Sequence, residues 1–309
     1  MPGLPFALPL GVVEFGLRGP EWAAFVRRLP RLFSELTDEW DLAYDGEAWH
    51  GHCSLVTPVR TSAGVPAALK VTWDGDVESE FEALALQRWG GRGSVRLLRA
   101  DPHRRALLLE RLQQETLAEI GDIEACEVVA GLYPHLHVSA PPQLRTVTSY
   151  VERWVAPLLS LARDAPIPRR LVEQAVTLAR DLVADPSSTG VLVHGDLHYA
   201  NVLRGDRLPW LAIDPKPMSG DPHYEPAPML WNRWEELAGD VRDGVRRRFH
   251  TLVDGGGLDE DRARDWVVVR MVLNAHWAIE DADRLGRPLD RDGLEWITIC
   301  VAVAKAVQH

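Results

Sequence analysis

The sequence has 309 residues and a formal net charge of −11, because 45 Asp and Glu outnumber 34 Lys and Arg. This balance excludes a protein held to nucleic acid by a bulk basic field, so we expect no nucleic-acid polymer as a partner. Hydrophobic residues make up 46% and charged residues 26%, which is typical of a globular protein and excludes a disordered or collagen-like chain. Three scattered cysteines indicate neither a disulfide framework nor a zinc site.

The apolar segments do not have the form of targeting or membrane-spanning segments. The run at residues 266–279 is interrupted by Arg270 and is too short to cross a bilayer. The N-terminal residues contain prolines and no basic residue before Arg18, unlike a signal peptide. We therefore expect a cytoplasmic protein without membrane association, and the sequence implies no protein partner.

The first part of the chain predicts a helix followed by a small sheet. The helical pattern lies at residues 21–36 and is expected to break at Pro30. Three short strands, one helix and two more strands follow. In that order they are predicted at residues 40–44, 53–59, 65–73, 79–89, 95–99 and 106–112.

The remainder of the chain is mainly helical and contains one short β-like island. Helices are predicted at residues 123–135, 146–162, 169–184, 258–285 and 294–307. The island consists of apolar runs at residues 191–193, 202–204 and 210–213. A small sheet followed by a helical region predicts an α+β protein of two lobes with a cleft between them. We expect an N-terminal nucleotide-binding lobe with a helical extension at residues 1–112, and a catalytic and substrate-binding lobe at residues 113–309.

The island carries a motif suited to phosphoryl transfer, His194-Gly-Asp-Leu-His-Tyr-Ala-Asn201, with Asp214 at the end of the last apolar run. That reaction needs a carboxylate to accept the proton of a hydroxyl, and oxygen ligands for Mg²⁺ on the nucleotide phosphates. Asp196 can serve as the carboxylate, and Asn201 and Asp214 are hard oxygen ligands. Asparagine occurs only three times in the chain, so this spacing is a specific signal. The alternative is a polar loop whose Asp and Asn only cap turns.

Together with Ile213-Asp214, this motif resembles the catalytic and metal-binding loops of the aminoglycoside phosphotransferases, which are relatives of the protein kinases. The resemblance implies a protein-kinase-like fold with a small β-rich N-terminal lobe and a larger, mainly helical C-terminal lobe. It also implies that Asp196 is the catalytic base and that Asn201 and Asp214 hold Mg²⁺. We expect His194 and His198 to brace the loop through hydrogen bonds.

The resemblance extends to the predicted sheet. The segment Ala67-Ala-Leu-Lys70-Val71 resembles the third strand of a kinase lobe, whose lysine pairs with the nucleotide phosphates. Lys70 is one of only three lysines, and an edge-strand lysine is the alternative reading. Its expected ion-pair partner is Glu82 on the following helix, with Glu80 and Glu78 as the fallbacks.

The segment Leu107-Leu-Leu-Glu110-Arg-Leu112 resembles the strand that runs into the hinge between kinase lobes. The resemblance implies that the backbone from Glu110 to Leu112 binds the adenine edge of ATP. The sequence departs from the kinase pattern in one respect, because no GxGxxG phosphate loop lies between the first two strands. Residues 45–51 are the nearest stretch, and ordinary turn glycines explain them equally well.

Within the family, the resemblance is to the streptomycin 6-kinase branch, also described as aminoglycoside/hydroxyurea resistance kinases, and covers about residues 40–283. It is carried by the segments at residues 94–98, 210–217, 220–222 and 226–232. It implies ATP and Mg²⁺ as cofactors and transfer of the γ-phosphate to a hydroxyl of a small cationic, streptomycin-like aminoglycoside. Glu225 stands where we expect Asp in relatives.

A polycationic substrate favours a site with carboxylates and an aromatic face. In the helix predicted at residues 258–285, Asn274, Trp277 and Asp281 share one face. The candidate substrate-binding residues on and near this face, and beyond Asp214, are Asp221, Glu225, Asn274, Trp277, Glu280, Asp281 and Asp283. For any one of them, an exposed helix face or a capped turn is the simpler alternative.

Two other functions remain open from the sequence. The catalytic loop handles only phosphate and a generic hydroxyl, so the acceptor could be another small molecule such as hydroxyurea or a biosynthetic intermediate. The more distant alternative is a metal-dependent hydrolase. Its metal ligands would come from His194, Asp196, His198, Asp214, Asp221 and His223. That alternative leaves Lys70, Glu82 and the hinge strand without a role.

Overall fold

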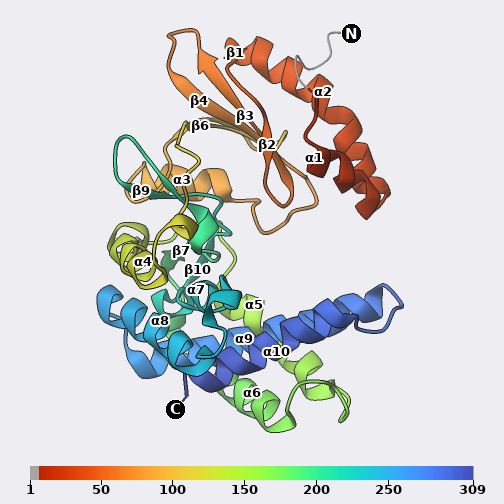
Figure 1. Cartoon of the computed structure of the whole chain (residues 1–309), viewed down its shortest axis with the longest axis vertical. Helices are drawn as coiled ribbons and strands as arrows, with labels where there is room; N and C mark the ends of the chain where they lie inside the picture. Colours follow the sequence, from red (N-terminus) through yellow and green to blue (C-terminus); the bar gives the residue numbers. More distant parts are fainter. Residues whose placement is uncertain (1–6, 309) are drawn as a thin grey trace. The chain divides into compact units, whose positions relative to one another are not determined.

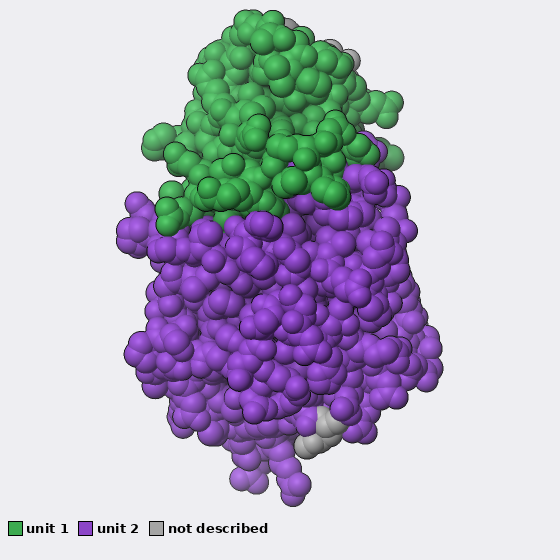
Figure 2. Space-filling model, turned by 90° about the vertical axis from the view of Figure 1, so that its left-hand side faces the viewer, with its two compact units in different colours: residues 1–113, 205–209 green, residues 114–204, 210–309 purple. Residues whose placement is uncertain are grey.

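The chain forms two compact units in a computed structural model that describes residues 7–308. Unit 1 comprises residues 1–113 and 205–209, and unit 2 comprises residues 114–204 and 210–309 (Figure 2). The short segment at residues 205–209 was not anticipated, because it is remote in sequence from the rest of unit 1.

Unit 1 is built on an antiparallel sheet in the order β1-β3-β4-β6-β5, with β2 paired to β3 (Figure 1). The long central strands are rich in β-branched and other apolar residues, which favour a pleated, half-buried surface. The strand bounds are β1 Leu42–Tyr44, β2 Trp49–His50, β3 Ser54–Thr61, β4 Pro66–Thr72, β5 Leu97–Asp101 and β6 Ala106–Glu110. Among the strands in the described part of unit 1, the two-residue strand β2 alone has no counterpart among the predicted strands.

Helix α2 (Pro20–Trp40), preceded by α1 (Leu10–Phe15), packs on one face of this sheet. Its side chains Phe25, Leu29 and Phe33 share a core with residues of β3, β4 and β6. The predicted break at Pro30 was wrong, since α2 continues through it. An internal proline costs about 3 kcal/mol. Each large apolar side chain buried along α2 stabilises by about 1.5–3 kcal/mol, so the buried row outweighs the proline.

The charged residue Lys70 of β4 lies on the face of the sheet opposite to α2. Leu69 and Val71 belong to the core shared with α2. Because successive side chains of a strand point to opposite faces, Lys70 points away from that core. Helix α3 (Glu82–Trp89) supplies its partner, as described below.

Unit 2 is mainly helical, and α9 lies at its centre, packed against α10, α6 and α5. All five helices predicted in this half are present. The long helices are α4 Asp122–Leu136, α5 Val147–Ser160, α6 Arg169–Ala184, α8 Val241–Gly256, α9 Glu260–Arg284 and α10 Arg291–Ala306, and α7 (Ala227–Trp231) is short. Within residues 7–308, no helix has the length and apolar character needed to span a membrane.

Helix α8 was not predicted, because arginines and glycines dilute its apolar pattern. Its buried residues Val245, Phe249 and Leu252 nevertheless follow helical spacing. Gly255 and Gly256 are the last two residues of α8. A Cβ at Gly255 would lie 2.9 Å from the side chain of Ala130, so glycine allows α8 to approach α4 closely.

The β-like island forms two separate antiparallel pairs. Strand β7 (Val191–Val193) pairs with β10 (Met218–Gly220), and β8 (Val202–Arg204) pairs with β9 (Trp210–Ala212). The sequence predicts three of these strands but not β10, which is only three residues long and contains Gly220. The two pairs place the motif loop and the segment after β9 side by side.

Candidate active site

The motif loop begins where β7 ends, and Asn201 closes it. The Nδ2 atom of Asn201 donates to the backbone oxygen of Asp196 at 2.8 Å and lies 3.1 Å from Nε2 of His198. A carbonyl oxygen only accepts hydrogen bonds, so the nitrogen side of the Asn201 amide must face Asp196. The amide oxygen of Asn201 is therefore not used by that backbone oxygen, and an amide oxygen is a suitable ligand for a hard cation.

His194 ties the motif loop to the segment after β9. Its Nε2 lies 2.9 Å from the backbone oxygen of Ile213 and must donate, while Nδ1 accepts from the backbone N–H of Asp196 at 3.3 Å. Burial lowers the pKa of His194 to about 3, so the ring is neutral near pH 7. Both ring nitrogens have protein partners, which fits the expected bracing role and not that of a base or metal ligand.

Asp196 has the properties of a proton acceptor. Burial is the main cause of a pKa raised above the ordinary carboxyl value. Its side chain is nevertheless 32% exposed, and Oδ2 lies 3.8 Å from Nε2 of His198. Burial also lowers the pKa of His198, so that ring tends to be neutral. A partly exposed carboxylate with a raised pKa is a stronger base than an ordinary aspartate.

Asp214 lies two residues after the end of β9 in a left-handed backbone conformation, with φ of 54°. Asp is one of the few residue types that tolerate this region. The backbone N–H of Ile213 donates to the backbone oxygen of Asn201 at 2.9 Å. The backbone N–H of Lys216 donates to the backbone oxygen of His194 at 2.8 Å. These bonds hold Asp214 beside the loop that carries Asp196 and Asn201. The structure thus brings the three predicted catalytic and metal-binding residues into one region of unit 2.

Gly195 permits this close approach. Its φ is +81°, and a Cβ atom there would lie 2.3 Å from the backbone oxygen of Lys216. We expect Gly195→Ala to cost at least about 1 kcal/mol from the backbone conformation alone, plus the cost of moving a backbone carbonyl. Urea unfolding will measure the loss, and Gly121→Ala is the control, because nothing lies within 4 Å of its added Cβ. Equal effects of the two substitutions would contradict the close-packing argument.

Glu225 is buried and bonds to the backbone of the motif loop. It is fully buried, and its Oε1 accepts the backbone N–H of His194. Burial raises the pKa of Glu225 to about 7, although the backbone N–H groups of His194 and Gly195 and the charge of Arg270 act against this shift. The placement inside the unit makes Glu225 a support of the loop.

This burial predicts a pH dependence of stability. A carboxyl group whose folded pKa lies above its unfolded value of about 4.5 contributes stability that is lost as pH rises between 4.5 and about 7. Over that window the wild type should lose on the order of 3 kcal/mol relative to Glu225→Gln, which keeps the acceptor and does not ionise. The measurement is urea unfolding of both proteins at pH 5 and pH 8. A difference that does not change with pH would contradict the buried carboxyl assignment.

Asp221 is also enclosed, at 1% exposure. Its oxygens bind Nε of Arg262 at 2.5 Å, Nε1 of Trp266 at 2.7 Å, and the backbone N–H of His223 at 3.0 Å. The side chain of Arg262 also reaches Asp185. Asp221 therefore connects the segment after β10 to α9 through protein contacts.

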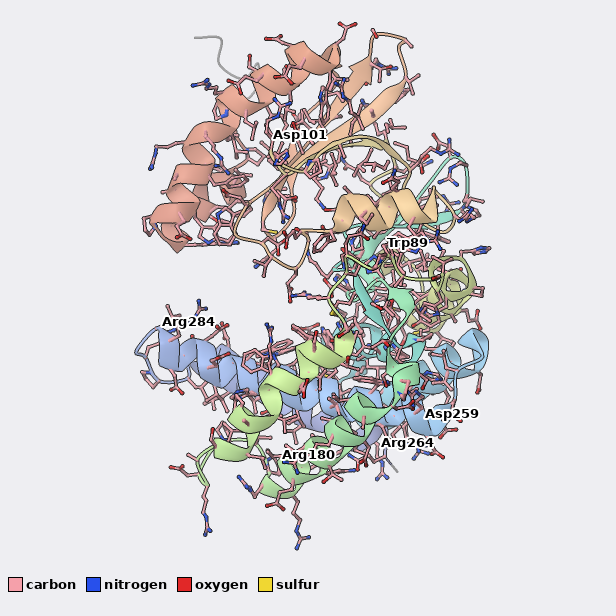
Figure 3. All side chains as sticks on the ribbon, turned by 180° about the vertical axis from the view of Figure 1, so that it is seen from behind. Trp89, Asp101, Arg180, Asp259, Arg264 and Arg284 are labelled. Atoms are coloured by element: carbon pink, nitrogen blue, oxygen red, sulfur yellow. The ribbon has the colours of Figure 1, made fainter. Side chains whose placement is uncertain are left out.

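Helix α9 connects the remaining substrate candidates to the catalytic loop. Arg270 is buried and donates to the backbone oxygens of Gly195 and Tyr224. Asn274, Trp277 and Asp281 follow Arg270 by about one, two and three helical turns on the same face. This face therefore begins at the motif loop and continues toward Arg284 at the end of α9 (Figure 3).

The α9 face changes from buried to exposed along its length. Asn274 is 6% exposed, and Trp277 packs edge-on against Tyr150 and Trp154 of α5 at centroid distances of 5.7 and 6.0 Å. The Nε1 donors of Trp154 and Trp277 have no hydrogen-bond partner among the described residues. Asp281 pairs with Arg284 at 2.8 Å. Glu280 and Asp283 are exposed carboxylates at the same end.

In unit 1, Lys70 and Glu82 form a buried ion pair. The Nζ atom lies 2.8 Å from both carboxylate oxygens, and the two residues are only 5% and 3% exposed. The fallback partners Glu78 and Glu80 are exposed. The pair joins β4 to the first turn of α3 and holds the lysine side chain in one position.

The end of β6 has both used and unused backbone groups. The N–H of Glu110 donates to the Arg96 oxygen at 2.9 Å, and the Glu110 carboxylate binds Arg207 at 2.7 Å. Arg111 binds the Asp45 carboxylate at 2.7 Å. Among the described residues, none forms a hydrogen bond with the backbone of Arg111 or Leu112. This part of the predicted hinge therefore has backbone groups available for a ligand.

The ligand set of the hydrolase alternative does not assemble. Among residues 7–308, no three His, Cys, Asp or Glu side chains converge as a metal-binding group. His194 uses both ring nitrogens for backbone contacts, while His223 contacts Asp221 through Nδ1 and the Asp259 backbone N–H through Nε2.

Two basic residues of this region received no role from the sequence. Lys216 has Nζ 3.5 Å from Oδ2 of Asp214, and Arg270 binds the backbone of the motif loop. The scarcity of lysine was an available signal for Lys216. For Arg270, the signal was a charged residue within an otherwise apolar helical run.

Comparison with known proteins agrees with this geometry. The family model for aminoglycoside/hydroxyurea antibiotic resistance kinases matches residues 39–282. The chain is 40% identical over 270 residues to a streptomycin 6-kinase of Streptomyces glaucescens, covering 85% of this chain and 87% of the relative. It is also 40% identical over 291 residues to a hydroxyurea phosphotransferase of Kitasatospora aureofaciens, covering 91% and 83%.

Among solved structures, one similar fold is that of a thermostable mutant of an aminoglycoside phosphotransferase in ternary complex with ADP and hygromycin B. The TM-score is 0.57 at 16% identity, covering 89% of this chain and 98% of that chain. The protein-kinase-like fold inferred from the sequence is thereby confirmed. By the extent of the family match and of the 40% relatives, this chain belongs to the aminoglycoside/hydroxyurea antibiotic resistance kinases and is an ATP-dependent small-molecule phosphotransferase.

Proposed function

We propose that the chain transfers the γ-phosphate of ATP to a hydroxyl of streptomycin or a closely similar cationic aminoglycoside. The observation that carries this substrate choice is the 40% identity to a streptomycin 6-kinase, together with the carboxylate-bearing face of α9. The runner-up acceptor is hydroxyurea, favoured by the equal identity to a hydroxyurea phosphotransferase.

Asp196 acts as the base in this proposal. Its carboxylate orients the acceptor hydroxyl and takes its proton as the hydroxyl oxygen bonds to the γ-phosphorus. The bond between that phosphorus and the oxygen bridging to the β-phosphate breaks, and ADP leaves. Support comes from the raised pKa and partial exposure of Asp196, and from the rigid hold that Asn201 and His194 have on its backbone.

Asn201 and Asp214 are the proposed Mg²⁺ ligands. The hydrogen bond of Asn201 to the Asp196 backbone uses its amide nitrogen and leaves its amide oxygen available, and Asp214 supplies a carboxylate, so the donor set suits a hard cation. When bound, the ion neutralises charge on the nucleotide phosphates. Lys70, oriented by Glu82, pairs with phosphate oxygens, and the backbone from Glu110 to Leu112 binds the adenine edge.

The substrate site in this proposal follows α9. Asn274 and Trp277 contact the acceptor nearest the motif loop, and the carboxylates of Glu280, Asp281 and Asp283 attract its cationic groups. We assign Asp221 and Glu225 to supporting roles instead, because both side chains are buried, Asp221 binds Arg262 and Trp266, and Glu225 accepts the backbone N–H of His194.

Replacing Asn274 by Ala should raise the KM for streptomycin by roughly tenfold, since one hydrogen bond of about 1.4 kcal/mol is lost. The KM for ATP should change less than twofold. Steady-state kinetics with each substrate varied in turn will test this. Thr298→Ala on α10 is the control, because that hydroxyl bonds only to the backbone of its own helix. An unchanged KM for streptomycin would remove Asn274 from the site.

The proposed function itself is tested by measuring ATP consumption with streptomycin, other aminoglycosides and hydroxyurea, followed by mass spectrometry of each product. We expect a gain of one phosphate on streptomycin only. Phosphorylation of hydroxyurea alone would establish hydroxyurea as the acceptor. If neither streptomycin nor hydroxyurea is phosphorylated, both proposed acceptors are overturned.

A further inference from the structure

Lys216 of unit 2 lies beside the proposed metal ligand Asp214. Its Nζ lies 3.5 Å from Oδ2 of Asp214, and its side chain is only 15% exposed. It also interacts electrostatically with Asp196, whose pKa it lowers in opposition to burial. The lysine is thus close to both acidic groups of the site.

The backbone holds Lys216 in this position. Pro215 and Pro217 flank it and restrict the chain on both sides. Its N–H donates to the His194 oxygen at 2.8 Å, and its carbonyl lies so close to Gly195 that only glycine fits there. A flexible side chain on so rigid a backbone can move its ammonium over a small range without moving the loop.

Neutralising Asp214 does not by itself account for a lysine here. In the proposed complex Asp214 faces Mg²⁺, and a second cation at the same carboxylate would be repelled by that ion. The negative charges near the ammonium would then be Asp196 and the transferring phosphoryl group, whose charge spreads over three oxygens during transfer. A compact ammonium with three donors suits those oxygens.

We propose that Lys216 is a further catalytic residue, whose ammonium contacts the γ-phosphoryl group of ATP and stabilises its charge during transfer. This inference rests on the proposed phosphoryl-transfer roles of Asp196 and Asp214.

The test compares nucleotides with and without the γ-phosphate. Dissociation constants of AMP-PNP and ADP, both with Mg²⁺, are measured by calorimetry for the wild type, Lys216→Met and Lys216→Arg. A lost charge-assisted contact of about 1.5–3 kcal/mol predicts a weakening of AMP-PNP binding by roughly 10- to 100-fold in Lys216→Met. ADP binding should change less than threefold, and Lys216→Arg should retain part of the AMP-PNP preference.

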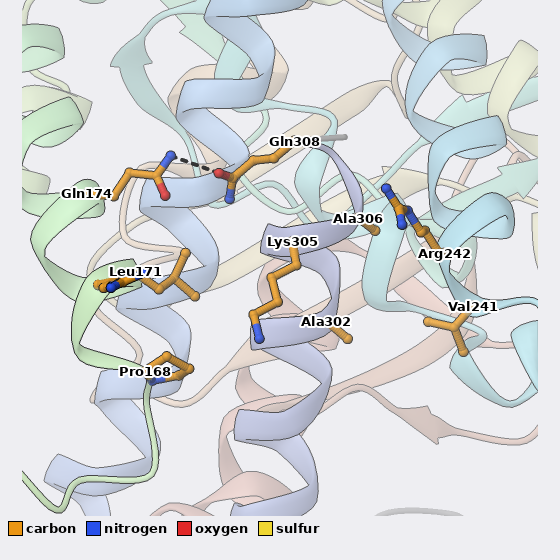
Figure 4. Close-up of a pocket in the computed structure, with 10 residues that line it drawn as sticks. Pro168, Leu171, Gln174, Val241, Arg242, Ala302, Lys305, Ala306 and Gln308 are labelled. Atoms are coloured by element: carbon orange, nitrogen blue, oxygen red, sulfur yellow. Dashed lines mark hydrogen bonds between the residues drawn. The ribbon is translucent and has the colours of Figure 1, made fainter.

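Lys305→Met is the matched control. Lys305 is exposed on α10 and lines a cavity of about 610 Å³ between α6, α8 and α10 that contains none of the proposed site residues (Figure 4). Its substitution should leave both dissociation constants unchanged. Circular dichroism verifies folding, and Lys216→Gln replaces Lys216→Met if the latter unfolds.

Equal weakening of AMP-PNP and ADP, or no weakening of either, would overturn the proposal. A role limited to neutralising Asp214 predicts the opposite change, tighter Mg²⁺ binding with both nucleotides, and would also overturn it. The binding experiment contains no acceptor. If the wild type phosphorylates neither streptomycin nor hydroxyurea, the proposed substrate fails while the nucleotide comparison still decides the role of Lys216.

Discussion

Asp196→Asn is expected to lower kcat by about 10²- to 10⁴-fold while leaving the binding of Mg²⁺ with AMP-PNP within about threefold of wild type. The amide cannot accept the proton of the acceptor hydroxyl at neutral pH. The change preserves the shape of the side chain and the backbone oxygen that Asn201 binds, so the loop should keep its conformation. The measurements are single-turnover phosphorylation and calorimetric titration of AMP-PNP.

Asp181→Asn is the control for this substitution, because Asp181 is exposed on α6. It should leave kcat unchanged. Turnover close to wild type in Asp196→Asn would exclude Asp196 as the base. Loss of AMP-PNP binding in the same variant would instead assign Asp196 to the nucleotide site.

Glu82→Gln is expected to lower the free energy of unfolding by about 3–5 kcal/mol, because it leaves the Lys70 ammonium buried without its carboxylate. Both Glu82 oxygens lie 2.8 Å from Nζ, and neither residue is more than 5% exposed. Urea unfolding followed by tryptophan fluorescence measures the change. Glu80→Gln, an exposed carboxylate in the preceding turn, should change stability by less than about 0.5 kcal/mol.

A double substitution separates stability from catalysis. Lys70→Met with Glu82→Leu removes both charges, and replacing a buried pair by apolar groups is often neutral for stability. We expect the double variant to recover most of the stability lost in Glu82→Gln and to remain catalytically inactive, because the phosphate contact of the Lys70 ammonium is lost. An active double variant would contradict the assignment of Lys70 to the nucleotide.

Much of the fold could be predicted because its elements carry local patterns. The central strands, α3, and the helices α4, α5, α6, α9 and α10 were predicted from periodicity, and the family and the kinase-like fold from short motifs. Where the local pattern was weak or misleading, the prediction failed. Arginine and glycine masked α8, β10 is only three residues long, and Pro30 suggested a break that packing against the sheet prevents.

The sequence by itself determined the motif from His194 to Asn201, the pairing of Lys70 with a glutamate on the next helix, and the family. These features depend on residues close together in the chain or at characteristic spacings. Only the tertiary structure decided that Asp221 and Glu225 are buried, that Arg270 reaches the motif loop, and that Lys216 lies beside Asp214. Burial and long-range contacts arise from how separate helices and loops pack. The residue type alone therefore does not reveal whether a carboxylate is buried or exposed.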